Sequence, residues 1–314
     1  MNTRVISEGP AVVAFNGQNY YTEGTITLTP DLKLREKTSA LHGTVDRRVT
    51  DKLFTLAFTP FGEMNGNAAK YFPFTAADIG RLIAPATDTP VVIYAASGER
   101  LAFPAGCILA CPQLLLGTDK GPMGEMSIAC MGDLAGTDAA DGTHYAIDQA
   151  QISAHTLNPD HAPTPAYKAI LGEGADAIEI DGETGFTFDI GAELTPRAVN
   201  RYGTVNFRLS ALNPSIAFQP FGPSIADIAK VWNIQGAGAA RLGASNRLRK
   251  PLTLSPADPA DKGPSIRFPD CMMREGSMLF GMSDPRHGQY ALVPAMRVTG
   301  GIPEPLFSID FPTW

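Results

Sequence analysis

Short segments of alternating apolar and polar residues run along this chain. Residues 26–28 (ITL) and 186–188 (FTF) alternate with a period of two, which is the pattern of a half-buried β-strand. Short apolar runs follow a proline at residues 90–94 and 251–254, and these also predict strands. The pattern predicts a mainly β protein in which each part carries few helical residues.

Two stretches of the chain repeat each other. Residues 26–62 align with residues 186–222 without a gap, and about 30% of the positions are identical, against roughly one in fifteen by chance. The repeated scaffold positions are Gly43, Thr44, Val45, Phe58, Pro60, Phe61 and Gly62 in the first stretch and Gly203, Thr204, Val205, Phe218, Pro220, Phe221 and Gly222 in the second. Self-similarity of this kind predicts a duplicated structural unit.

The same signals follow each stretch in the same order. Thr75 and Ser224 each begin an [ST]-x-x-D pattern that can cap a helix, and apolar residues follow at helical spacing. We therefore expect one helix at residues 75–83 and one at residues 224–232. A strand, a Phe-Pro dipeptide and a candidate hairpin come next in both copies, which makes an accidental match improbable.

The boundary between the copies is rich in proline. Residues 153–165 contain three prolines and almost no apolar pattern, which is typical of an extended linker. We expect a first domain at residues 1–152 and a second at residues 166–314. Each is predicted to be a β-sandwich with one flanking helix, an α+β arrangement. The tail after Gly301 has no counterpart that the sequence reveals.

A charged segment lies between two strand signals of the first copy. Residues 33–42 have no apolar spacing that ties them to a core, so they predict a long exposed hairpin loop or an extended pair of strands. Such a segment can order on a partner. The residues expected to contact a neighbouring subunit are Lys33, Leu34, Arg35, Glu36, Lys37 and Thr38.

Composition narrows the function. Hydrophobic residues make up 44% of the chain, enough for a core, and 31 glycines and 26 prolines fit frequent turns between strands. The net charge of −7 argues against wrapping nucleic acid or adhering to an anionic membrane. Four cysteines without a CxxC pair predict reduced, buried thiols. The first ten residues lack the apolar segment of a signal peptide.

Catalytic signatures do not emerge from the sequence. No zinc-protease, nucleophile-elbow, phosphate-loop or calcium-loop pattern occurs, and the five histidines are scattered. The GxGxxA-like residues 172–177 lead into a strand pattern, whereas a dinucleotide loop must open a helix, so we interpret them as a turn. We expect no enzyme activity, no cofactor and no metal site.

The order of these elements resembles that of the bacteriophage tail tube, or major tail, proteins. The resemblance is carried by residues 43–48 (GTVDRR), residues 55–62 (TLAFTPFG), the capped helix after them and the closing hairpins. Proteins of that family are β-sandwiches with a flanking helix, and some carry two tube domains in one chain. Three such chains then form a six-domain ring, and the rings stack into a tube.

The resemblance implies a structural protein of the virion tail, assembled in the cytoplasm of a bacterial host. Its main partner would be itself, as homotrimeric rings, with tape-measure, tail terminator and baseplate proteins as further partners. Four strands from each of six domains would make a barrel of about 24 strands, wide enough for a bore. A negative bore would let DNA pass as cargo that does not adhere. No catalytic residue is carried over, because the family has none.

Two other functions fit the same residues. One is a different tail or baseplate component built from the same domains, such as a hub or a distal tail adaptor. The other is a soluble β-sandwich module that binds sugar or protein. That module would need an exposed aromatic platform, and the chain has only two tryptophans, Trp232 and Trp314.

Overall fold

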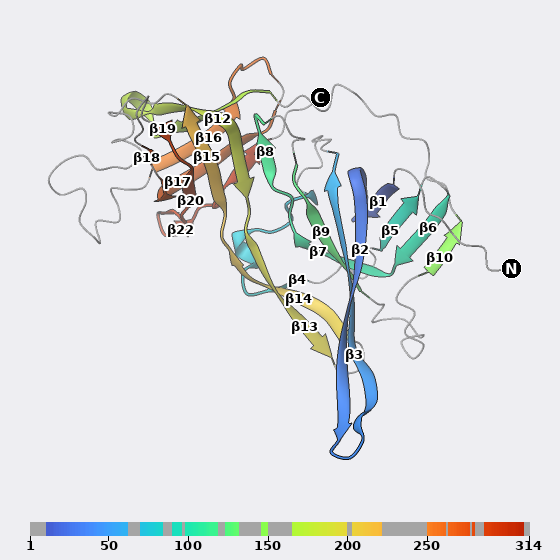
Figure 1. Cartoon of the computed structure of the whole chain (residues 1–314). Helices are drawn as coiled ribbons and strands as arrows, with labels where there is room; N and C mark the ends of the chain where they lie inside the picture. Colours follow the sequence, from blue (N-terminus) through green and yellow to red (C-terminus); the bar gives the residue numbers. More distant parts are fainter. Residues whose placement is uncertain are drawn as a thin grey trace.

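The protein is mainly β, and its strands pair in antiparallel sheets (Figure 1). The computed structural model describes residues 11–61, 70–83, 90–95, 98–118, 123–131, 146–149, 165–199, 203–221, 250–261, 263–276, 278–279 and 286–310. Within these ranges, helical structure is limited to two single turns of 3-10 helix, η2 (Ala76–Asp78) and η4 (Gly174–Asp176). The predicted fold class is therefore confirmed at the level of its strand content.

The first half of the chain closes into a barrel, here called barrel 1. Its strands are β1 (Ala11–Phe15), β2 (Gln18–Ser39), β3 (Gly43–Pro60), β5 (Val91–Ala95), β6 (Glu99–Phe103), β7 (Ala105–Ala110) and β9 (Met126–Met131). Pairing runs from β1 through β2, β3 and β9 to β7, and from β1 through β5 to β6. Only Pro104 separates β6 from β7, so together they serve as one strand that closes a ring of six.

The second half closes in the same way into barrel 2. Its strands are β11 (Tyr167–Leu171), β12 (Ile178–Asp189), β15 (Ser215–Phe221), β16 (Lys250–Pro256), β17 (Ser265–Glu275) and β20 (Tyr290–Pro294). β11 pairs with both β12 and β16, and β17 pairs with both β16 and β20. The ring therefore returns to its starting strand. The expected sandwiches are closed barrels, which leaves each ring without an edge strand of its own.

The two barrels share their pairing register as well as their strand order. Corresponding pairs are Thr27↔Ala57 and Thr187↔Ala217, Phe58↔Met126 and Phe218↔Tyr290, and Val91↔Phe103 and Leu252↔Phe268. Even the irregularity between Ile108 and Ala110 in β7 reappears between Met273 and Glu275 in β17. Register is strongly specified wherever one strand face is buried, so agreement over several strand pairs reflects the same core pattern in both barrels.

Each barrel extends into a two-stranded arm. Arm 1 consists of the parts of β2 and β3 between residues 30 and 52, and arm 2 consists of β13 (Ala192–Val199) and β14 (Gly203–Leu212). Register shifts occur after Lys33 and Lys37 in arm 1 and after Glu193 and Arg197 in arm 2, which are positions 160 residues apart. In Figure 1, barrels 1 and 2 lie side by side, and arm 1 projects away from both.

The two arms leave their barrels differently. β2 runs through Pro30 without a break, whereas the corresponding strand stops at Asp189 and resumes at Ala192. Gly191 has a φ of +56°, and a Cβ at this position would overlap the carbonyl oxygen of Asn213. A conformation that only glycine adopts easily therefore sets the bend at the root of arm 2.

Two strands from the first half of the chain pair with the second half. β8 (Leu114–Leu116) lies along β12, and β4 (Leu82–Ile83) lies along β14. Leu114 and Leu116 are almost fully buried and belong to one apolar core that extends into both barrels. Barrel 1 and barrel 2 are thus joined by main-chain pairing as well as by side-chain packing.

The helix predicted at residues 75–83 is wrong for most of its length. The predicted cap is present, because the Thr75 backbone N–H and hydroxyl both donate to Asp78 Oδ2, at 2.9 and 2.6 Å. The helical turn ends after Asp78, Gly80 takes a φ of +85°, and residues 82–83 form β4. The open edge of β14 offers paired hydrogen bonds that a short helix cannot match. The second predicted helix, at residues 224–232, lies outside the described residues.

The C-terminal tail has a counterpart that the sequence did not reveal. β23 (Ser308–Asp310) pairs with β17 in the way that β10 (Ala146–Gln149) pairs with β6. The remaining short strands form two hairpins, β18 (Met278–Leu279) with β19 (Arg286–His287) and β21 (Val298–Thr299) with β22 (Ile302–Pro303). The predicted linker at residues 153–165 lies outside the described residues except for Pro165.

Candidate assembly surface

Arm 2 packs on the outer surface of barrel 1. Cys107, Ala129 and Met131, from β7 and β9, form an apolar cluster with Phe207 of β14, and each of the four is at most 3% exposed. Leu194 of β13 packs against the same cluster. Because β-strand side chains alternate between two faces, the outward residues of β7 and β9 would meet water without arm 2.

A second contact extends the edge of β12. Leu114, Leu115 and Leu116 of β8 pair with Phe188, Thr187 and Phe186. Phe186 and Phe188 are fully buried. Gly185 has a φ of +80°, and a Cβ there would overlap the carbonyl oxygen of Leu116, so only glycine allows this close approach. The strand from barrel 1 therefore completes a sheet that begins in barrel 2.

A polar contact joins arm 2 to arm 1. Asp51 Oδ1 and Oδ2 accept hydrogen bonds from the backbone N–H and the hydroxyl of Thr204, at 2.6 and 2.8 Å, and Lys33 Nζ lies 3.3 Å from Oδ2. Burial raises the pKa of the Asp51 carboxyl, but these donors outweigh it, and the pKa falls below its usual value. Asp51 is therefore ionised and held in place at neutral pH.

We call these three contacts together the junction. One side consists of arm 2 and the β12 edge, and the other consists of β8, the outer face of β7 and β9, and Asp51. The two sides use different surfaces of two barrels with the same strand order. A contact of this kind is heterologous, or head to tail, and when repeated between copies it generates either closed rings or open helices.

The arm side of the junction has an uncovered counterpart on arm 1. Leu34 and Val49 pair directly across arm 1, as Leu194 and Leu209 do across arm 2. Leu34 is 54% exposed and Val49 is 46% exposed, whereas Leu209 is fully buried. The same apolar pair is thus covered in arm 2 and open to solvent in arm 1.

The barrel side has an uncovered counterpart too. The pair Met272↔Val293 in barrel 2 stands at the register position of Cys107↔Ala129 in barrel 1. Met272 and Val293 are half-buried, whereas Cys107 and Ala129 are almost fully buried. The outer face of barrel 2 is therefore apolar at the positions that arm 2 covers on barrel 1.

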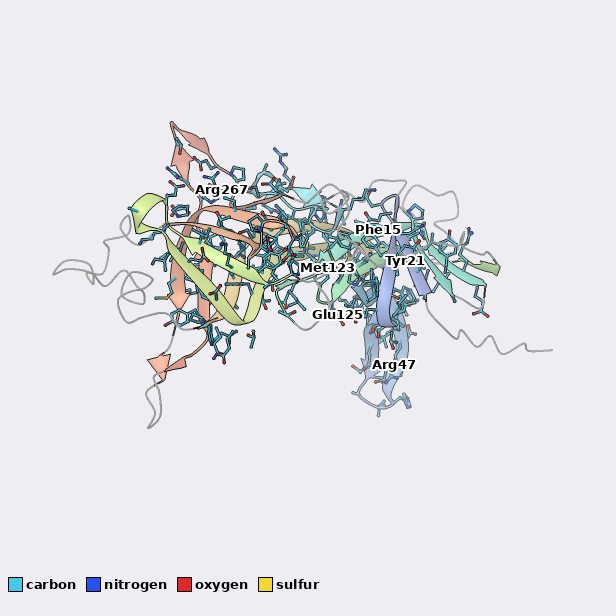
Figure 2. The ribbon with its side chains drawn as sticks, turned by 90° about the horizontal axis from the view of Figure 1, so that it is seen from above. Phe15, Tyr21, Arg47, Met123, Glu125 and Arg267 are labelled. Atoms are coloured by element: carbon cyan, nitrogen blue, oxygen red, sulfur yellow. The ribbon has the colours of Figure 1, made fainter. Side chains whose placement is uncertain are left out.

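The predicted contact residues Lys33, Leu34, Arg35, Glu36, Lys37 and Thr38 all lie on β2 in arm 1 and are exposed. They form the extended strand pair, which was one of the two predicted conformations. Figure 2 shows Arg47 on the projecting arm, where its Nε lies 2.8 Å from Glu36 Oε1. Arm 1 is therefore held by its own cross-strand pairs.

The repeated scaffold residues occupy matching places in the two copies. Gly43 and Gly203 open β3 and β14 with φ of +69° and +75°, which explains why both positions carry glycine. Phe58, Phe218, Pro60 and Pro220 are buried, whereas Phe61 and Phe221 are exposed. Thr44 and Val45 are exposed on arm 1, Thr204 is buried against Asp51, and Val205 is half-buried. Gly62 and Gly222 lie outside the described residues.

The buried thiols are unsuited to redox or nucleophilic chemistry. All four cysteines are free and buried, as the sequence predicted, and burial raises the pKa of Cys107 to about 12. A thiol must ionise to react or to bind metal, so these groups stay inert at neutral pH. In the part of the chain that the structure describes, no group of three or more His, Cys, Asp or Glu side chains could hold a metal ion.

A cavity of about 420 Å³ lies at the root of arm 2, lined by residues that include Cys111, Gln113, Asp189 and Gly191. Gln113 Nε2 donates to Asp189 Oδ2 at 2.9 Å, and Gly191 N–H donates to Asp189 Oδ1 at 2.8 Å. These bonds link the two barrels across the cavity, so its polar groups serve the junction.

Asp51 and the cluster under arm 2 were missed by sequence reasoning. Asp51 aligns with Ala211, so the repeat gives it no weight. Leu34 and Leu194 are identical in the aligned stretches, and this match was the available signal.

No protein-family model and no curated protein sequence matches this chain. Among the described residues there is no helix with the length and apolar character needed to cross a membrane.

Proposed function

We propose that this protein is a structural subunit that assembles head to tail into rings, and that the rings stack into a bacteriophage tail tube. The observation that carries the proposal is the junction, which joins two barrels of equal strand order while both of its counterpart surfaces stay uncovered. A monomeric module has no need of such a pair of apolar surfaces on opposite sides.

The matching registers support a duplicated tube domain. Strand order, pairing register and bulge positions agree between residues 18–61 and residues 178–221 at a spacing of 160 residues. If the contact between chains copies the junction within the chain, three chains supply six barrels in one ring. The copies differ in sequence, so such a ring has threefold and only approximate sixfold symmetry.

A tube of this kind would carry DNA without binding it. The net charge of −7 per chain opposes adhesion to phosphates, and no catalytic step is required of the subunit. The proposed place of the protein is the virion tail, after assembly in the bacterial cytoplasm. Tape-measure, tail terminator and baseplate proteins would be its further partners, and no cofactor or metal is needed.

A hub or distal tail adaptor is the nearer alternative, because it would use the same barrels and the same head-to-tail contact but would form a single ring. A soluble binding module for sugar or protein is the more distant one. The exposed leucines and valines of arm 1 favour assembly over such a module, since they offer apolar surface but no aromatic platform.

Negative-stain electron microscopy of the purified full chain tests the proposal. Long tubes of uniform width are the expected result. Isolated rings that never stack would favour the adaptor, and a monomer at high concentration would contradict both assembly functions.

A further inference from the structure

We propose that one chain docks arm 1 and the adjoining edge of β2 on barrel 2 of a second copy, with β18 of that copy adding a strand to β2. This inference rests on the proposed self-assembly, and it names the two surfaces that meet. It follows from the junction, which shows the same two contacts already made within one chain.

The side-chain half of the contact places the Leu34 and Val49 pair on the outer face of barrel 2. In the junction, the corresponding Leu194 and Leu209 pair lies on arm 2, which covers the outer face of barrel 1. Met272 and Val293 supply the equivalent apolar surface on barrel 2. Both surfaces are at least partly exposed in the single chain, and each has the shape of strand that the other covers elsewhere in the molecule.

The main-chain half of the contact uses the free edge of β2. Thr27 and Leu28 pair with β3 on one side, and no described strand pairs with them on the other. Their counterparts Thr187 and Phe188 are paired on both sides, because β8 occupies the second edge. An unpaired strand edge is a ready template for a strand from another chain.

The strand that fits this edge is β18. β8 leaves β7 after a short link, and β18 leaves β17 at the same place in barrel 2. Aligning the two gives Leu114 opposite Met278 and Leu115 opposite Leu279. β18 pairs only with β19 among the described strands, so its second edge is available.

The junction then fixes the register between chains. Phe188↔Leu114 and Thr187↔Leu115 translate into Leu28↔Met278 and Thr27↔Leu279. The correspondence starts at Thr27, since the preceding bulge places its positive φ at Gly24 in β2 and at Gly185 in β12.

Disulfide trapping between separately purified single variants tests this register. Directly opposed residues of an antiparallel pair have Cα atoms about 4.5–5.5 Å apart, which suits a disulfide. We expect Thr27→Cys and Leu279→Cys proteins, mixed and mildly oxidised, to give a covalent dimer that contains one of each. Neither protein alone should give it, and the four native cysteines are buried, so the background is low.

Two controls define the result. The double variant Leu115→Cys with Thr187→Cys should close a disulfide within one chain, since these residues pair in the junction. Glu23→Cys mixed with Leu279→Cys should give no mixed dimer, because Glu23 is exposed but lies outside the docking register.

Mass photometry of the unmodified protein separates the two hypotheses. If the chains associate but the mixed dimer does not form, the docking inference fails and self-assembly stands. If the chains stay monomeric at high concentration, both fail. A mixed dimer that depends on both cysteines supports the inference and its register.

Discussion

Asp51 joins the two arms through a few short hydrogen bonds. Its carboxylate is only 6% exposed as a residue and receives the two donors of Thr204 and the ammonium of Lys33. A buried carboxylate is stable only when its oxygens are satisfied, and these three groups satisfy them. The contact therefore links ionisation of one residue to the seating of arm 2.

Replacing this carboxylate should weaken the fold in a pH-dependent way. Hydrogen bonds to a charged group contribute about 1.5–3 kcal/mol, so Asp51→Asn should lower the free energy of unfolding by about that amount at pH 7. Because the folded-state pKa is lowered, the stabilisation is present above the unfolded pKa of about 3.9 and is lost as the pH falls through the folded value.

Urea denaturation at pH 7 and at pH 3 measures this difference. The gap between the wild type and Asp51→Asn should shrink at pH 3, where the wild-type carboxyl is becoming protonated. An equal gap at both pH values would show that the hydrogen bonds do not depend on ionisation.

Each arm is a two-stranded hairpin whose direction is set where it leaves its barrel. Arm 1 continues β2 and β3 without interruption, whereas arm 2 begins after the break at Ile190 and Gly191. The Gly191 N–H donates to Asp189 Oδ1, and Asn213 N–H donates to the Gly191 carbonyl at 3.0 Å. The break lets arm 2 form a sheet of its own with β4 while β12 stays in the barrel.

Two alanine substitutions separate backbone strain from steric overlap. Gly191→Ala and Gly43→Ala both force alanine into a positive φ, which costs about 1–2 kcal/mol. At Gly43 nothing lies within 4 Å of the added Cβ, whereas at Gly191 it would overlap the Asn213 carbonyl oxygen. Gly191→Ala should therefore be the more destabilising by at least 1 kcal/mol, as typical for overpacking. Thermal unfolding of both variants checks the order, and equal melting temperatures would contradict it.

The whole molecule is an unfinished chain of contacts. The junction satisfies arm 2 and barrel 1, and it leaves arm 1 and the outer face of barrel 2 at opposite ends of the same arrangement. A heterologous contact of this kind becomes complete only when it closes on itself or continues indefinitely. Association of the protein therefore depends on apolar surface at positions that do not stabilise the single chain.

An added charge on arm 1 should block association without unfolding the chain. Leu34 is 54% exposed and becomes covered in the proposed contact, so Leu34→Asp should raise the dissociation constant at least tenfold by burying an unpaired carboxylate. Leu41→Asp adds the same charge at the tip of arm 1, where the side chain is 89% exposed, and should assemble normally. Analytical ultracentrifugation compares the two variants, and equal association would exclude Leu34 from the contact.

The closed assembly should contain three chains. Six barrels in a ring require three chains, each of 33.4 kDa, so mass photometry should show a species of three times that mass. Image averages of single rings should show threefold symmetry with a weaker sixfold component. A ring of six chains would contradict the copying of the junction between chains.

The sequence alone predicted what depends on local pattern. Period-two alternation at residues 26–28 and 186–188 marks strands because adjacent side chains face opposite sides of a sheet, and β2 and β12 contain these residues. The repeat at a spacing of 160 residues reappears in the pairing registers. The domain limits at residues 152 and 166 stay a prediction.

Only the tertiary structure decided the features that join distant residues. Residues 82–83 fit a helical pattern, yet they form a strand because β14 offers its edge. Asp51 and Thr204 are 153 residues apart, and nothing near either residue in the sequence announces the other. Closure of the barrels and the seating of arm 2 likewise depend on which strand edges meet, because long-range pairing is chosen by competition among all available edges rather than by local propensity.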